Sequence, residues 1–102
     1  MFAQSNIAEP AVLLIIVCEE ILLESLLNLL KNLKVRGYTI ARVAAQDRLG
    51  QVIGNGTDDF TNVEIKAIAT KEVSEVVMHT LQKHRGDHRV LVYRQDIEVM
   101  VD

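Results

Sequence analysis

The basic side chains around residue 86 are the residues whose types and spacing point most directly to a chemical role. The cluster comprises Lys83, His84, Arg85, His88 and Arg89. Guanidinium and ammonium groups bind phosphate oxygens, and Gly86, inside the cluster, would let the backbone approach such a ligand closely. The same cluster also fits a solvated helix end, where cations complement the negative end of the helix dipole. Both interpretations remain open from the residues alone.

Three histidines raise the question of a metal site: His79, His84 and His88. A helix-ending glycine separates the last two, so a helical i, i+4 ligand geometry is not expected, and no cysteine is near. No metal is therefore expected, although a metal-responsive trimer of the divalent-cation-tolerance type is kept as an alternative. No group of residues resembles a nucleophile with its base, so we expect the protein not to be an enzyme.

The overall composition limits the function classes. The chain has 102 residues, a net charge of −3 and a pI near 5.6, which suits one domain and argues against a nucleic-acid binder that neutralises phosphates. Cys18 is the only cysteine, so no intrachain disulfide can form and a reducing compartment is expected. The longest apolar run, 11–18, is shorter than the ~20 residues of a membrane helix. We therefore expect a soluble, cytoplasmic protein without membrane insertion.

Two strand–helix–strand units, separated by a long loop, account for the periodicity of the sequence. Leucines at helical spacing predict the first helix, and we expect Gly37 to end it in a left-handed conformation, just before a strand that begins at Tyr38. Thr70 is the expected N-cap of the second helix. The expected segments are a loose N-terminal arm (1–10), a strand (11–18), a helix (19–34), a strand (38–45), a loop (46–59), a strand (60–69), a helix (71–85), a strand (90–94) and an alternating segment through residue 101. This order predicts a single α+β domain, 1–102, with the ferredoxin-like βαββαβ fold and an antiparallel sheet.

The first expected strand, 11–18, is apolar without alternation. Such a strand is usually covered on both faces, but two helices in a domain of this size cover only one face of the sheet. We therefore expect another copy of the chain to cover the other face, which makes the protein an oligomer.

The loop 46–59 lacks apolar periodicity and is rich in glycine. Loops of this length are uncommon in compact domains and are usually functional. We expect the loop to be mobile and to contact a partner protein. The candidate partner-binding residues are Leu49, Gly50, Val52, Ile53, Gly54, Asn55 and Gly56.

Three short stretches, in this order and spacing, give the chain a resemblance to a known family. They are Gly37-Tyr38-Thr39-Ile40 after the first helix, an Asn-Val-Glu-Ile strand after the long loop, and Gly-Asp-His-Arg-Val-Leu-Val from residue 86. The chain resembles the PII signalling superfamily, and most of all its short PII-like branch, which includes SbtB-type regulators of bicarbonate uptake and carboxysome-associated PII-like proteins. The resemblance runs from about residue 11 to residue 99 and implies a homotrimer.

The resemblance also implies a function. Adenine nucleotide (ATP, ADP, AMP or cyclic AMP) would bind in the clefts between subunits, and the loop 46–59 would be the T-loop, which reaches a target such as a membrane transporter or a carboxysome-related protein. Tyr38 and Thr39 would lie by the adenine, and Arg89 would stand where the family has a phosphate-binding lysine. The implied nucleotide-binding residues are Tyr38, Thr39, Arg48, Gly86, Asp87, His88 and Arg89.

The base of the T-loop departs from the family pattern. SbtB-type members have a glycine-rich base with paired arginines, whereas this chain has Ala44-Ala45-Gln46-Asp47-Arg48. Arg48 alone is left to meet a phosphate, and the neighbouring aspartate would repel one. In the second motif, His88 replaces a glycine. A trimeric interaction module that does not bind nucleotide therefore remains an alternative.

Overall fold

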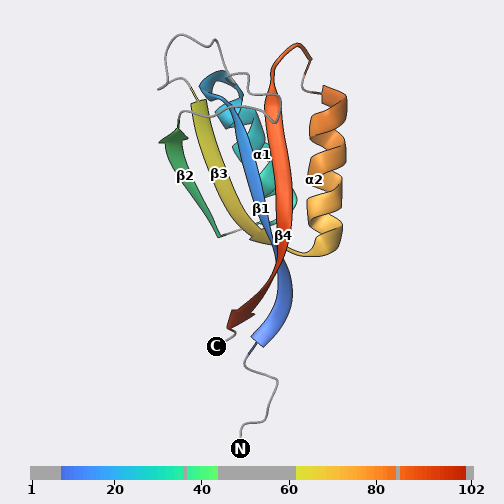
Figure 1. Ribbon diagram of the computed structural model, residues 1–102. Helices are drawn as coiled ribbons and strands as arrows, with labels where there is room; N and C mark the ends of the chain where they lie inside the picture. The colour runs from blue at the N-terminus through green and yellow to red at the C-terminus, as the bar shows by residue number, and fades with distance from the viewer. Residues whose placement is uncertain (1–7, 36, 44–61, 85, 101–102) are drawn as a thin grey trace, which may run out of the picture.

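The chain forms a four-stranded antiparallel sheet with two helices packed on it (Figure 1). The computed structural model describes residues 8–35, 37–43, 62–84 and 86–100. The elements are β1 (Ala8–Glu19), the short 3-10 helix η2 (Glu20–Leu22), α1 (Leu23–Asn32), β2 (Tyr38–Val43), β3 (Asn62–Ala69), α2 (Lys71–His84) and β4 (Val90–Met100). This order confirms the predicted ferredoxin-like fold class.

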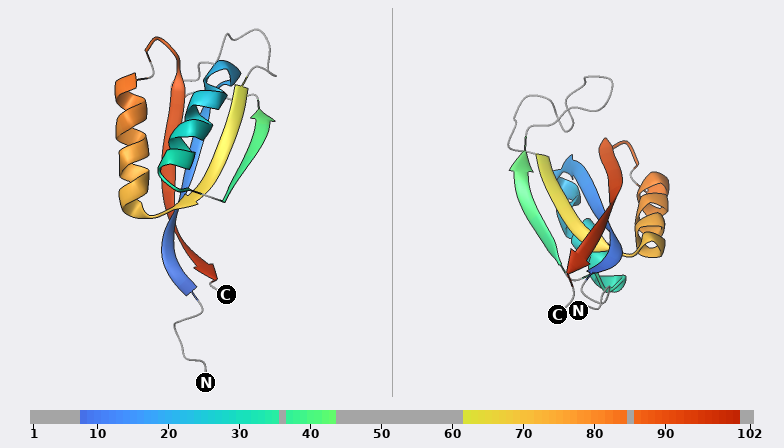
Figure 2. Two further views of the ribbon diagram at one scale, coloured as in Figure 1. Left: turned by 180° about the vertical axis from the view of Figure 1, so that it is seen from behind. Right: turned by 60° about the horizontal axis from the view of Figure 1, so that its bottom comes forward.

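The strands are arranged in the order β2-β3-β1-β4, and each neighbouring pair is antiparallel. Figure 2 shows that both helices cover the same face of the sheet; we call the other face the open face. The pairing of β1 with β3 ends at Val12 and Ala69, whereas β1 and β4 remain paired as far as Ala8 and Met100. The two strands therefore continue beyond the sheet as a ribbon (Figure 1).

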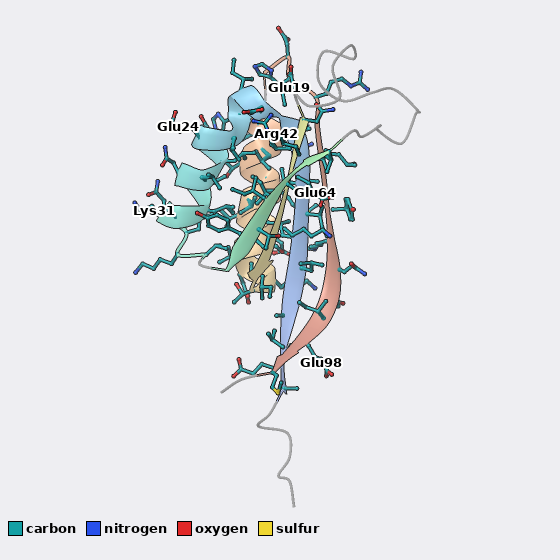
Figure 3. The ribbon with its side chains drawn as sticks, turned by 90° about the vertical axis from the view of Figure 1, so that its left-hand side faces the viewer. Glu19, Glu24, Lys31, Arg42, Glu64 and Glu98 are labelled. Carbon is teal, nitrogen blue, oxygen red and sulfur yellow. The ribbon has the colours of Figure 1, made fainter. Side chains whose placement is uncertain are left out.

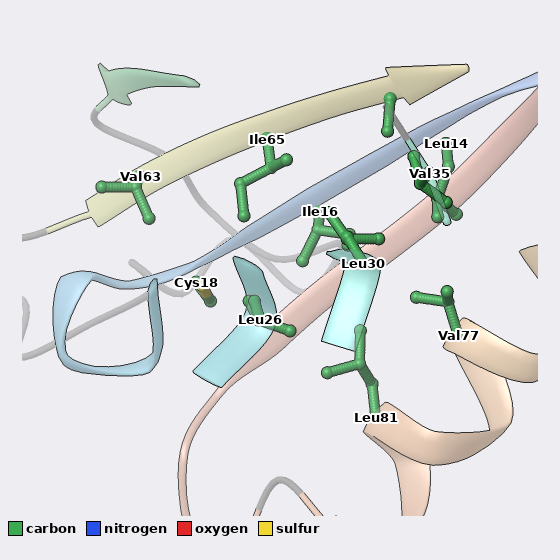
Figure 4. Close-up of a cluster of buried hydrophobic side chains, with 11 residues drawn as sticks. Leu14, Ile16, Cys18, Leu26, Leu30, Val35, Val63, Ile65, Val77 and Leu81 are labelled. Carbon is green, nitrogen blue, oxygen red and sulfur yellow. The ribbon is translucent and has the colours of Figure 1, made fainter. Parts of the chain in front are cut away.

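The main core lies between the sheet and the helices. Alternate side chains of β1 point toward the helices, because successive residues of a strand face opposite sides. This core consists of Leu14, Ile16 and Cys18 from β1, Val63, Ile65 and Ala67 from β3, Leu26 and Leu30 from α1, Val77 and Leu81 from α2, and Val35 (Figure 4). Fully burying one such aliphatic side chain contributes roughly 1.5–3 kcal/mol. The predicted leucine face of the first helix is thus a core face.

The central strand is also buried on the open face. Ile15 and Val17 are only 2% and 3% exposed, and they pack with Leu13, Val43 and Leu91. The apolar run of β1 is therefore covered on both faces within one chain. This differs from the expectation from the sequence, because Leu13, Val43 and Leu91 of the same chain pack against these two residues and no second copy is needed to bury them.

The end of α1 differs from the expectation. Lys34, not Gly37, takes the left-handed conformation, with φ 65°. The amide of Val35 donates to the carbonyl of Leu30 (2.9 Å), and the amide of Lys34 donates to the carbonyl of Lys31 (3.0 Å), which is the hydrogen-bond pattern of a Schellman motif. Val35 and Leu30 both belong to the core. The contact between Val35 and Leu30 thus stabilises the helix end at Lys34, even though a left-handed conformation would be less strained at Gly37.

Two further boundaries differ from the prediction by a few residues. Residues 8–10, expected in the N-terminal arm, belong to β1 because they pair with β4. The first turn of the expected helix is a 3-10 turn, η2, and α1 begins only at Leu23.

The second half of the chain follows the prediction closely. Thr70 caps α2 as expected, since its Oγ1 accepts a hydrogen bond from the amide of Val73 at 3.1 Å. β4 is one strand as far as Met100 rather than a strand followed by a separate segment. No helix among the described residues is long and apolar enough to cross a membrane.

Candidate functional site

The loop between α2 and β4 carries four of the predicted nucleotide-binding residues. Gly86 has φ 62°, a left-handed conformation that would strain any side chain. It turns the chain from the end of α2 toward β4, as the sequence predicted. The next residues, Asp87, His88 and Arg89, are therefore brought to the end of the sheet where β1 finishes, because Val90 pairs with Cys18 (Figure 1).

His88 contacts a carboxylate at this end of the sheet. Its Nδ1 lies 2.7 Å from Oε1 of Glu19, the last residue of β1. The two side chains are 40% and 26% exposed, so solvent screens the contact, and even a fully charged pair of this exposure contributes only about 0.2–1 kcal/mol. Glu19 therefore ties the loop to the sheet, and it also places a negative charge beside a residue predicted to meet phosphate.

An ion pair joins the end of β2 to the same region. Arg42 donates to both carboxylate oxygens of Glu20, with distances of 2.5 and 2.9 Å. Such a two-pronged geometry is the strongest that an arginine and a carboxylate can form. It joins β2 to η2 at the same end of the sheet as the His88–Glu19 contact. Figure 3 labels Glu19 and Arg42 at this end and Glu98 at the opposite end.

Asn62 adds a buried polar group to this edge. It opens β3, pairs with Glu19 of β1 and Val43 of β2, and is 0% exposed. Within the part of the chain that the structure describes, neither its Nδ2 nor its Oδ1 has a hydrogen-bond partner. A buried polar group left without a partner costs about 1–3 kcal/mol, so Asn62 is a position where a hydrogen-bond partner would stabilise the fold.

Sequence reasoning named none of Glu19, Glu20, Arg42 and Asn62 as site residues. At this end of the sheet, their neighbours are far away in the sequence. His88 and Glu19, for example, are 69 residues apart. Local patterns carry no signal for such pairs. Only the buried, polar start of β3, directly after a long loop, could have drawn attention to Asn62.

Tyr38 and Thr39 lie at the other end of the sheet. They pair with Ala67 and Lys66 of β3, about 16 Å along that strand from its first residue. Their side chains point to opposite faces, Tyr38 toward the helices and Thr39 toward the open face. One chain therefore does not bring these two residues together with the 86–89 loop.

The other predicted site residues lie outside the described part of the chain. These are Arg48, the T-loop base 44–47, and the candidate partner-binding residues Leu49, Gly50, Val52, Ile53, Gly54, Asn55 and Gly56. Their assignments stay predictions.

Cys18 lies next to this edge but inside the core. Burial, with a smaller contribution from the neighbouring carboxylate of Glu19, raises the pKa of the Cys18 thiol from its ordinary value of 9.0 to about 11. A thiol with so high a pKa is protonated at neutral pH and is a poor nucleophile. Cys18 is therefore an apolar filler of the core.

The described residues line several surface hollows but form no metal site. Among them, no three His, Cys, Asp or Glu side chains are close enough together to hold a metal ion. A small hollow lies between α2 and β4, lined by Leu81, Gln82, Val90 and Val92. Two larger hollows flank the β1–β4 ribbon, and both are lined by Pro10, Ala11 and Thr70. These two larger hollows lie at the end of the sheet opposite the 86–89 loop, and none of the predicted phosphate-binding residues lines any of the three.

Comparison with known proteins gives matches at the level of structure. No family model and no curated protein matches the sequence. Among solved structures, the chain is similar to TTHA0516, a PII-like signalling protein from Thermus thermophilus, with 26% identity and a TM-score of 0.71 over 91% of each chain.

The chain is also similar to CPII, a nitrogen regulatory PII-like protein from Thiomonas intermedia. The apo form of CPII matches with 26% identity and a TM-score of 0.74, over 93% of this chain and 97% of that chain. A form of CPII bound to ADP, AMP and bicarbonate matches with 23% identity and a TM-score of 0.78, over 95% and 94%. GlnK of B. subtilis, in complex with ATP, shares the fold, with 19% identity and a TM-score of 0.52 over 91% and 85%.

These similarities cover nearly the whole chain, at 26% identity and TM-scores of 0.71 and 0.74. The chain belongs to the PII superfamily, in its PII-like branch.

Proposed function

We propose that the protein is a homotrimeric PII-like signalling regulator, not an enzyme, that binds an adenine nucleotide in the clefts between subunits. Nucleotide binding would then control how the loop 46–59 contacts a partner protein. The observation that carries the proposal is the loop at Gly86, whose left-handed turn delivers His88 and Arg89 to the end of the sheet. In CPII, a protein of similar structure, ADP and AMP are bound.

The separation of the two halves of the predicted site supports a cleft between subunits. Tyr38 and Thr39 lie at one end of the sheet and the 86–89 loop at the other. A ligand smaller than the sheet can contact both only if a second copy supplies one half. Ile68 and Tyr93, both large apolar residues on the open face, are 44% and 46% exposed, and an interface between copies would bury them.

The charges at the site suggest which nucleotides bind best. Arg89 and His88 attract phosphate, but the carboxylates of Glu19 and Asp87 lie close by. Each additional phosphate therefore adds repulsion as well as attraction. We expect ATP to bind no more tightly than AMP or cyclic AMP.

Calorimetry with ATP, ADP, AMP and cyclic AMP tests nucleotide binding, and light scattering tests the assembly. We expect at least one nucleotide to bind below about 1 mM, which corresponds to about 4 kcal/mol, and a mass three times that of the monomer. Bicarbonate is added in a parallel titration because a CPII structure contains it. A monomeric protein at micromolar concentration would contradict the proposed cleft.

A trimeric interaction module without nucleotide is the second candidate. One observation favours it: His88 is already engaged by the carboxylate of Glu19 at 2.7 Å. A protein that binds none of the four nucleotides, but still captures a transporter or a carboxysome-related protein through residues 46–59, would support this candidate.

A further inference from the structure

The contact between His88 and Glu19 determines which ring nitrogen of His88 carries hydrogen. Nδ1 of His88 lies 2.7 Å from Oε1 of Glu19. An ionised carboxylate only accepts hydrogen bonds, so the hydrogen of this contact belongs to the imidazole, and Nδ1–H donates to Glu19. A neutral imidazole carries hydrogen on one nitrogen only. In its neutral form, His88 held in this way therefore has no hydrogen on Nε2.

The second nitrogen, Nε2, has opposite properties in the two charge states of this ring. In the neutral ring, Nε2 is an acceptor, and a phosphate oxygen is an acceptor too, so no hydrogen bond forms between them. In the protonated ring, Nε2–H donates and shares the positive charge, which favours a short, charge-assisted hydrogen bond to phosphate. The His88 side chain is 40% exposed, so a solute can reach it. As long as Glu19 holds Nδ1, His88 can bind a phosphate only as an imidazolium.

The charged groups around His88 come from every element that reaches this end of the sheet. Carboxylates, lysines and arginines ordinarily keep their charge between about pH 6 and pH 8.5. Burial raises the pKa of the Cys18 thiol to about 11, which is well above this range. Among the described residues here, a change of charge near neutral pH is thus expected only of the imidazoles. The titratable or charged side chains are Cys18 and Glu19 of β1, Glu20 of η2, Arg42 of β2, Glu64 of β3, Lys83 and His84 of α2, and Asp87, His88 and Arg89 of the 86–89 loop.

We propose that His88 makes nucleotide binding depend on pH, because it binds a phosphate through Nε2 only while its ring is protonated and Glu19 holds Nδ1. This inference rests on the proposed function and adds a regulation of the same site. The bound state favours the protonated ring, so the affinity is highest in slightly acidic solution. It falls as the pH rises through the range in which imidazoles lose a proton, about pH 5 to 8. The protein then responds to pH as well as to the nucleotide concentration.

Calorimetry with cyclic AMP at a series of pH values from about 6 to about 8.5 measures the effect. Cyclic AMP suits this test because its phosphodiester keeps a single negative charge over the whole range, so the ligand itself does not titrate. We expect the affinity to fall roughly tenfold from about pH 6 to about pH 8, since a hydrogen bond between charged groups is lost. AMP is measured in parallel above about pH 7, where its phosphate, with a second pKa of about 6, is already largely ionised. Its affinity should also fall with rising pH.

Two histidine variants assign the pH dependence to one ring. His88→Gln keeps a side chain that can donate a hydrogen bond but does not titrate, so its affinity for cyclic AMP should stay constant over the same pH range. It should be weaker than that of the wild type at the acidic end. His84→Gln is the matched control, because it removes an exposed imidazole from the last turn of α2, four residues away. It should keep the pH profile of the wild type.

Nitrogen NMR of the imidazole rings tests the contact without any ligand. In alkaline solution, where imidazoles are neutral, His88 should carry its hydrogen on Nδ1, because Glu19 accepts from that nitrogen. Free histidine prefers the opposite form, with the hydrogen on Nε2. The exposed ring of His84 provides the internal comparison and should show this ordinary preference.

Three results would overturn the inference: a wild-type affinity that does not change with pH, a pH profile of His88→Gln that matches the wild type, or a neutral His88 ring with its hydrogen on Nε2. Failure of the proposed function looks different. In that case the wild-type protein binds none of the nucleotides at any pH, and the inference falls with it.

Discussion

Glu19 lies where its charge should weaken nucleotide binding, and this can be tested by a single substitution. Its carboxylate contacts His88 at 2.7 Å, next to the residues proposed to meet the phosphates. Glu19→Gln keeps the shape of the side chain and removes the charge, so this carboxylate no longer competes with the ligand for His88. We expect the substitution to tighten nucleotide binding.

The expected magnitude follows from the exposure of the pair. The side chains are 40% and 26% exposed, and ion pairs of this kind contribute about 0.2–1 kcal/mol. Since 1.4 kcal/mol is a factor of ten, the affinity should rise by roughly 1.5- to 5-fold. The gain should be larger for ATP than for AMP because the repulsion removed grows with the charge of the ligand. It should shrink at high salt, which screens exposed charges.

Glu20→Gln is the control for net charge. Glu20 follows Glu19 in the sequence and carries the same charge, but it pairs with Arg42 instead of His88. Calorimetry at low ionic strength, with AMP and ATP, compares the two variants. Equal gains in both variants would mean that only the net charge matters. Weaker binding in Glu19→Gln would mean that the carboxylate orients His88 toward the ligand, and either result would refute the reasoning.

Four further predictions concern the site and the fold. Arg89→Ala should weaken nucleotide binding by roughly ten- to a hundredfold, because a hydrogen bond to a charged group contributes about 1.5–3 kcal/mol, and Thr39→Val should cost less; similar losses in calorimetry would contradict the assignment of the phosphates to Arg89. Deleting residues 52–57 should abolish partner capture in a pull-down while the thermal midpoint stays nearly unchanged, and a large fall in the midpoint would make the loop structural. Thr70→Ala should destabilise the protein by about 0.5–2 kcal/mol in urea unfolding through loss of the α2 cap, with nucleotide affinity unaffected. Because the folded pKa of Cys18 is raised from 9.0 to about 11, the unfolded chain loses this proton first, so stability should fall as the pH rises from 9 to 11; Cys18→Ala should flatten that part of the profile, and an equally steep fall in the variant would assign it to other groups.

Local patterns in the sequence were sufficient for the order of the elements. The spacing of leucines and the alternation in the strands predicted βαββαβ, and Thr70 and Gly86 marked the start and the end of α2. These features depend on residues within a few positions of one another, so the sequence by itself determines them. The same stretches, read in order, were enough to suggest the family.

The tertiary structure alone decided what meets at the end of the sheet. Cross-strand register places Glu19 beside His88 and aligns it with Asn62, and no local pattern encodes that alignment. Packing also overruled a local preference: the core contact of Val35 makes Lys34, rather than the glycine at 37, take the left-handed turn. Burial and pairing between distant residues are set by the whole fold, because each depends on side chains that only the folded sheet brings together.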